Sequence, residues 1–183
     1  MIIYSRQTTP IDEHVLTTGE IVDIPENDPF DFFRGGKGKL IGDGIDFNIE
    51  QMKYGKGYDH NFCIMNKDEA SKLGVNYDGT FEIKNEGDEQ LDGKGRMHAK
   101  FHSDISGITM TICSTEPGLQ FYDGYDLNET LTNYDGKAIT QYGAIALESQ
   151  HYPDWPNHTN FESNYIVPGQ KFVSKSEYRF TVE

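Results

Sequence analysis

The sequence contains very few cysteines, and both lie in apolar surroundings. Cys63 and Cys113 are the two among 183 residues, and each lies in a segment typical of a strand. Structural disulfides are rare in reducing compartments, and the pair does not show the spacing of zinc ligands. We therefore expect two buried, free thiols.

Basic residues are also scarce relative to acidic ones. Lys and Arg total 16 against 30 Asp and Glu, which gives a formal net charge of -14. A chain with this charge repels both the phosphate backbone of nucleic acids and an anionic membrane surface. We expect neither nucleic acid nor a membrane as a partner.

Long apolar runs are absent as well. No segment approaches the roughly 20 apolar residues that a membrane-spanning helix needs. The first ten residues, "MIIYSRQTTP", lack the apolar core of a signal peptide. We expect a soluble, cytoplasmic protein whose 183 residues form a single domain, 1–183.

Motifs for cofactors and metals are missing too. The glycines of "GGKGKLIGDG" (35–44) lack the ordered spacing of a dinucleotide-binding loop, and "DGYDLNE" (123–129) does not follow the EF-hand pattern. His98 and His102 share a strand face but are about 13 Å apart at the usual rise per residue. This separation is too large to chelate one ion, so we expect two surface histidines, no metal and no cofactor.

Residues that favour strands and turns are abundant. The chain has 19 glycines, seven prolines, 11 tyrosines and 11 phenylalanines, as expected for short strands separated by turns. Apolar and polar residues alternate over 97–102 and 108–112, which predicts a hairpin with one apolar and one polar face. Alternation also predicts strands over 79–87 and 176–183, whereas 66–74 contains at most one short helix. The fold class is all-β.

One carboxylate stands out in "YGAIALESQHYPD" (142–154). Counting by twos along a strand places Glu148 on the same face as Tyr142, Ala144 and Ala146. A carboxylate above small residues leaves space for a ligand. The alternative is a glutamate at a strand end that simply faces solvent.

Two further segments carry polar groups at strand positions. Asp59 and His60 precede the apolar stretch "FCIM", and Gln120 and Tyr122 share one face of the segment "GLQFY". An amide, a carboxylate and exposed aromatic rings are the groups that hold a sugar, because they bond its hydroxyls and cover its carbon skeleton. A carbohydrate is therefore a plausible ligand on chemistry alone.

Six segments together resemble the aldose 1-epimerase, or galactose mutarotase, family. The resemblance implies a large antiparallel β-sandwich and interconversion of the α and β anomers of galactose, glucose and related aldoses without a cofactor. The matching segments are spread over nearly the whole chain and occur in this order: "TPIDEHVLTTGEI", "DPFDFF", "GYDHNF", "EPGLQFYDG", "LESQHYPD" and "YIVPGQKFVSKSEYRF".

The resemblance also implies roles for three residues. Glu148 resembles the catalytic base, which takes the proton from the anomeric hydroxyl. Asp59 resembles the aspartate that hydrogen-bonds sugar hydroxyls, and Gln120 a glutamine of the same pocket. Ring opening needs a base at the anomeric hydroxyl and an acid at the ring oxygen, and the two roles reverse when the ring closes.

The family's general acid is a histidine in a segment upstream of the "TPIDEH" region, and the chain begins just before that region. It therefore resembles only the C-terminal portion of a mutarotase, and none of its six histidines has a matching context. His60 and His151 lie in shared segments, where packing and support of the site are expected. We expect the isolated chain to turn over slowly or to be a non-catalytic carbohydrate-binding or degenerate module. Since the resemblance implies that early strands of the sandwich are missing, we also expect a homo-oligomer or a complementing chain to cover what they leave exposed.

Overall fold

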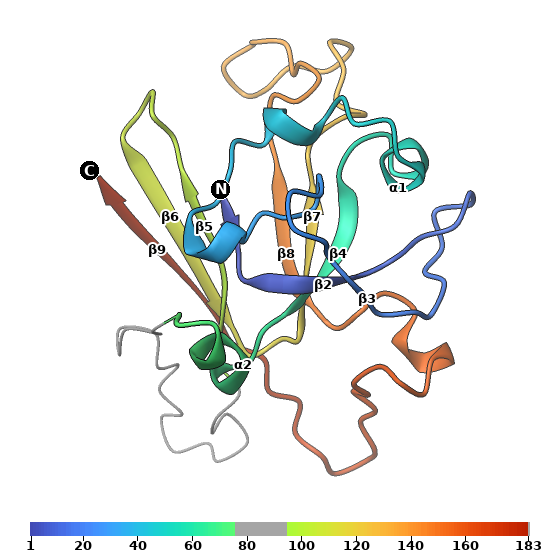
Figure 1. Cartoon of the computed structure of the whole chain (residues 1–183). Coiled ribbons are helices and arrows are strands. Elements are labelled where there is room, and N and C mark those ends of the chain that lie inside the picture. The colour runs from blue at the N-terminus through green and yellow to red at the C-terminus, as the bar shows by residue number, and fades with distance from the viewer. Residues whose placement is uncertain (76–94, 183) are drawn as a thin grey trace.

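The strands form two antiparallel sheets. The computed structural model describes residues 1–75 and 95–182 of the chain (Figure 1). A four-stranded sheet has the order β1-β5-β6-β9, and a five-stranded sheet has the order β3-β2-β4-β7-β8. The strands are β1 (Ile2–Ile3), β2 (Ser5–Thr9), β3 (Val22–Asp23), β4 (Asp59–Ile64), β5 (Arg96–His102), β6 (Ile108–Ser114), β7 (Gly118–Tyr122), β8 (Ala146–Gln150) and β9 (Ser176–Val182).

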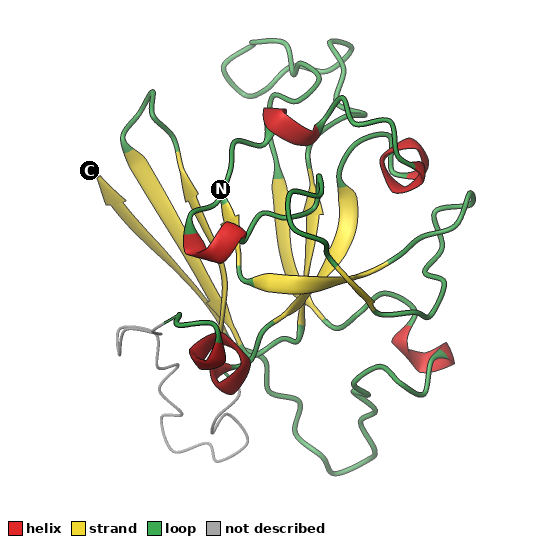
Figure 2. Ribbon diagram, in the orientation of Figure 1, coloured by secondary structure: helices red, strands yellow, loops and turns green. Residues whose placement is uncertain are grey.

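Helices are few and short, as Figure 2 shows. Within residues 1–75 and 95–182 the α-helices are α1 (Glu50–Tyr54) and α2 (Lys67–Lys72), and 3₁₀ turns cover Arg34–Gly36, Gly42–Gly44 and Trp155–Asn157. The Asn66 side chain accepts hydrogen bonds from the first turn of α2, and the Asn66 N–H donates one to the Glu69 carboxylate. This capping box accounts for a short helix within residues 66–74, as expected.

The inner faces of the two sheets share one core. Ile3 and Ala99 from the four-stranded sheet join Phe62, Leu119 and Phe121 from the five-stranded sheet in a single buried cluster. Alternation along β7 produces this arrangement, because Leu119 and Phe121 point inward while the residues between them point outward. The expected antiparallel β-sandwich is confirmed.

The expected hairpin forms from β5 and β6, but His98 is not a surface residue. His98 is completely buried, whereas His102 is exposed. The register shifts between Met97 and Ala99, so one extra residue is accommodated in β5 at this point. A bulge of this kind interrupts strict alternation, which is why counting by twos placed His98 wrongly.

The expected strand around Glu148 is shorter than its sequence pattern. Tyr142 has a φ of 57° and lies in a turn, and β8 begins only at Ala146. A positive φ interrupts an extended strand, so Tyr142 and Ala144 do not share a strand face with Glu148.

Three other expectations have different outcomes. Cys63 and Cys113 are both buried and form no disulfide, as expected. The strand expected over residues 176–183 is confirmed over its described part as β9, Ser176–Val182. The strand expected over 79–87 lies outside the described residues.

Candidate functional site

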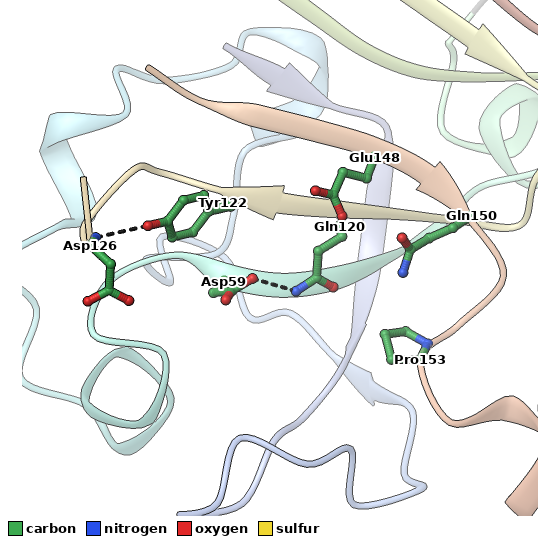
Figure 3. Close-up of a pocket in the computed structure, with 7 residues that line it drawn as sticks. All are labelled: Asp59, Gln120, Tyr122, Asp126, Glu148, Gln150 and Pro153. Carbon is green, nitrogen blue, oxygen red and sulfur yellow. Dashed lines mark hydrogen bonds between the residues drawn. The ribbon is translucent and has the colours of Figure 1, made fainter. Parts of the chain in front are cut away.

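An open groove of about 470 Å³ lies over the outward face of strands β4, β7 and β8 (Figure 3). Its volume is within the usual range for small-molecule sites. The lining residues are mostly polar and include all three residues predicted for the site: Asp59, Gln120, Tyr122, Asp126, Glu148, Gln150 and Pro153.

Strand register brings the three predicted site residues together. Gln120 on β7 lies directly opposite Glu148 on β8, and Asp59 on β4 lies opposite Tyr122, two residues further along β7. Side chains opposite one another on neighbouring strands have Cβ atoms about 5 Å apart. The Gln120 Nε2 also donates a hydrogen bond of 2.7 Å to Asp59 Oδ1. The predicted residues therefore line one surface.

Burial differs among these side chains. Asp59 and Gln120 are half-buried, while Glu148 is exposed. The exposed carboxylate is open to a ligand entering the groove, and the two half-buried groups form its floor. Tyr122 closes one end, where its phenolic oxygen accepts a hydrogen bond of 2.9 Å from the Asp126 backbone N–H.

Two amide oxygens near the groove lack hydrogen-bond partners among the described residues. They are Gln120 Oε1 and Asn61 Oδ1, both buried. Asn61 lies opposite Gln120 in the register, and its Nδ2 donates to Thr9 Oγ1. Buried polar atoms are normally bonded, so each oxygen keeps an acceptor position that no described residue fills. Sequence reasoning missed Asn61, although its position two residues after Asp59 on β4 indicated the same face.

The Asp123 side chain is hydrogen-bonded to the backbone just before β4. Its carboxylate accepts hydrogen bonds from the backbone N–H groups of Tyr58 and Tyr125, at 2.9 and 3.0 Å. Burial raises the pKa of Asp123 above its ordinary value, and the nearby charge of Asp59 acts in the same direction. Because Tyr58 precedes Asp59, Asp123 fixes the backbone from which Asp59 projects.

His60 and His151 lie outside the lining of the groove. The buried His60 ring packs edge-on against Phe30 at 4.7 Å, and burial lowers its pKa to about 4. His151 Nδ1 lies 2.7 Å from Glu116 Oε2. Both contacts agree with the expected packing and supporting roles.

The described residues contain neither a metal-binding cluster nor a membrane-spanning helix. Within 1–75 and 95–182, no three His, Cys, Asp or Glu side chains are grouped so that they could hold an ion. No helix in these same ranges has the length and apolar character needed to cross a bilayer.

Comparison with solved structures identifies the fold. The GalM/aldose epimerase homologue from C. elegans superposes with a TM-score of 0.69 at 18% identity, over 99% of this chain and 45% of that one. The galactose 1-epimerase from Lactobacillus acidophilus gives a TM-score of 0.62 at 20% identity, over 99% and 43%.

Sequence comparison identifies the family. The chain is 26% identical to bovine galactose mutarotase over 98% of its own length and 45% of the relative's. It is 28% identical to the aldose 1-epimerase of Escherichia coli over 79% and 35%. The chain thus spans less than half the length of these relatives. The aldose 1-epimerase family model matches residues 1–179, and the chain belongs to that family.

Proposed function

We propose that this chain carries the base and part of the sugar-binding surface of an aldose 1-epimerase. The observation that supports this proposal most directly is the placement of Glu148, Gln120 and Asp59 on one groove surface with an exposed carboxylate. The ligand is an aldose in its ring form, and galactose and glucose are the first sugars to test.

In the proposed reaction, Glu148 removes the proton from the anomeric hydroxyl. The C1–O5 bond then breaks, O5 receives a proton, and the open aldehyde rotates before the ring closes on its other face. Asp59 and Gln120 hold hydroxyl groups of the sugar, with the unpartnered Gln120 Oε1 as a further acceptor. Atoms and protons balance without a cofactor.

The proton for the ring oxygen must come from a general acid. No histidine is among the described residues that line the groove. A general acid and a general base each contribute about 10² to 10⁴ in rate. We therefore expect slow turnover by this chain alone, and faster turnover once another polypeptide segment supplies the acid. The same observation favours a second candidate function, carbohydrate binding without catalysis.

The test measures galactose mutarotation by polarimetry and galactose binding by ligand-observed NMR. Glu148→Gln keeps the size of the side chain but removes the proton acceptor, so the rate should fall by at least about 10²-fold while binding changes little. Binding should be in the millimolar range, about -4 kcal/mol, because the ligand is small and polar.

Glu129→Gln is the matched control, because Glu129 is exposed and lies outside this groove. It should have the wild-type rate and affinity. Binding without any rate above the uncatalysed one would support the second candidate function. Equal rates for wild type and Glu148→Gln, both above the uncatalysed rate, would show that Glu148 is not the base.

A further inference from the structure

Strand β8 is the edge strand that carries Glu148 and Gln150 into the groove (Figure 3). In the described part of the five-stranded sheet, β8 pairs with β7 and with no second strand. An edge strand has backbone hydrogen bonds on one side only, so contacts of its inward side chains are needed to fix its position. The inward residues of β8 are therefore relevant to the groove.

The inward-pointing Ser149 is tied to the opposite sheet through the buried His98. His98 Nε2 lies 3.0 Å from the Glu116 carbonyl oxygen, and His98 Nδ1 lies 3.1 Å from Ser149 Oγ. Because a carbonyl only accepts, Nε2 carries the hydrogen, and Nδ1 accepts from the Ser149 hydroxyl. Burial lowers the pKa of His98 to about 3, which keeps this ring neutral.

Directly after β8, His151 makes a second link to Glu116. Its Nδ1 lies 2.7 Å from Glu116 Oε2, and the Ser174 hydroxyl donates to Glu116 Oε1. Burial acts to raise the pKa of Glu116, but the bonds from His151 and Ser174 outweigh it and the pKa lies below its ordinary value. Glu116 is therefore a carboxylate held from both sides.

The backbone around Glu116 is itself fixed. Its N–H donates to Ser114 Oγ at 3.2 Å, and the residue lies between β6 and β7. Strand β7, which begins at Gly118, carries Gln120 opposite Glu148. Glu116 is thus connected through the backbone to β7, which carries Gln120, and through hydrogen bonds to β8, which carries Glu148.

We propose that Glu116 is a positioning residue of the groove. It sets the position of β8, and so of Glu148 and Gln150, through His98 to Ser149 and through its own carboxylate to His151. Both links start at Glu116. One ends at Ser149 and the other at His151, which are the neighbours of Gln150 in the sequence. The proposal rests on the proposed function of the groove only in assigning a sugar as the ligand that depends on this positioning.

The experiment compares Glu116→Gln with wild type by NMR on protein labelled uniformly with nitrogen and carbon isotopes, so that backbone amides and Glu and Gln side chains are all observed. The substitution removes the charge that holds His151 while keeping the backbone carbonyl that holds His98. We expect the Glu148 carboxyl carbon and the Gln150 side-chain amide to shift, while the Asp59 backbone amide stays at its wild-type position. Affinity for galactose should fall by about threefold to tenfold, the size of one hydrogen bond.

Ser174→Ala is the matched control, because it removes a bond to the same carboxylate without touching β8; it should leave both groove signals unchanged. Ser149→Ala removes the hydrogen bond between Ser149 and His98 and should shift the Glu148 and Gln150 signals. Ser149→Thr keeps the hydroxyl and should leave these signals at their wild-type positions. If Glu116→Gln does not fold, the shift of the Glu148 and Gln150 signals in Ser149→Ala tests the proposal in its place.

Unchanged groove signals in Glu116→Gln, or equal shifts in Ser174→Ala, would overturn the proposal. The spectra are recorded without sugar. A wild-type protein that binds no galactose therefore contradicts the proposed function, while the shifts still decide whether Glu116 positions β8.

Discussion

At the scale of single residues, the neutral His98 makes the stability of the sandwich depend on pH. Burial lowers the pKa of His98 to about 3 and that of His60 to about 4, from an ordinary value of 6.5. Between these values the unfolded chain binds more protons than the folded chain. The contribution to stability is therefore complete above pH 6.5 and is lost as the pH falls towards 4.

The substitution His98→Gln tests this dependence. Glutamine can still donate to the Glu116 carbonyl but does not titrate. From pH 6 to pH 5 the free energy of unfolding should therefore fall less steeply in His98→Gln than in wild type. The two slopes should differ by about 1.4 kcal/mol per pH unit, because one titrating group has been removed. Urea unfolding followed by Trp155 fluorescence measures the slope. His14→Gln, at an exposed histidine, should keep the wild-type slope; the same slope in His98→Gln would mean that His98 is not the group responsible.

The residue scale is also where prediction from sequence was least complete. His98 occupies a polar position in the alternating pattern over 97–102, and no feature of the sequence indicates the bulge that buries it. Asn61 went unnoticed because an amide on a strand resembles any other polar position. Both residues are defined by contacts with strands distant in the sequence, which a local pattern does not contain.

At the scale of elements, alternation predicted β7 correctly and β8 only in part. Leu119 and Phe121 are buried and Gln120 and Tyr122 are half-buried, as the pattern of β7 indicates. The apolar and small residues before Ala146 continue the same pattern but lie in a turn. One hydrogen bond accounts for the turn at Tyr142, because the Tyr142 N–H donates to the Gly124 carbonyl and not to a neighbouring strand.

Close packing against β7 leads to a prediction at Gly118. A Cβ atom there would lie 2.4 Å from Asn61 Oδ1 and 2.9 Å from Tyr152 Cδ1. Gly118→Ala should therefore displace one of these side chains and lower the free energy of unfolding by about 1–3 kcal/mol. Gly42→Ala is the control, because nothing lies within 4 Å of its Cβ position. Equal denaturation midpoints for the two variants would show that the space at Gly118 is not needed.

At the scale of the whole molecule, the sequence pattern predicted the fold class but not the pairing. Asp59 and Gln120 are 61 positions apart and meet because β4 pairs with β7. Alternation gives each strand two faces without saying which strands are neighbours. The three site residues were placed in one pocket by resemblance to a family, and the register accounts for how they meet.

Strand β9 lies at one edge of the four-stranded sheet, next to β6 (Figure 1). Several apolar side chains on these two strands are exposed. Phe180 and Val182 on β9 are 64% and 78% exposed, and they lie opposite Met110 and Ile108 on β6. Further along the same pair of strands, Tyr178 lies opposite the fully buried Ile112. The exposed face is thus a continuation of the buried one, and exposed apolar patches are typical of surfaces that contact other molecules.

We expect the purified chain either to associate through this face or to bind a hydrophobic dye there, since burying one such side chain contributes about 1.5–3 kcal/mol. Phe180→Ser should lower the dye fluorescence and shift the mass measured by light scattering towards the monomer. Tyr134→Ser is the control, because Tyr134 is 97% exposed on a loop and should contribute to neither signal. A monodisperse wild-type monomer that melts cooperatively and binds no dye would contradict this expectation, and the net charge of -14 would then be enough to keep copies of the chain apart.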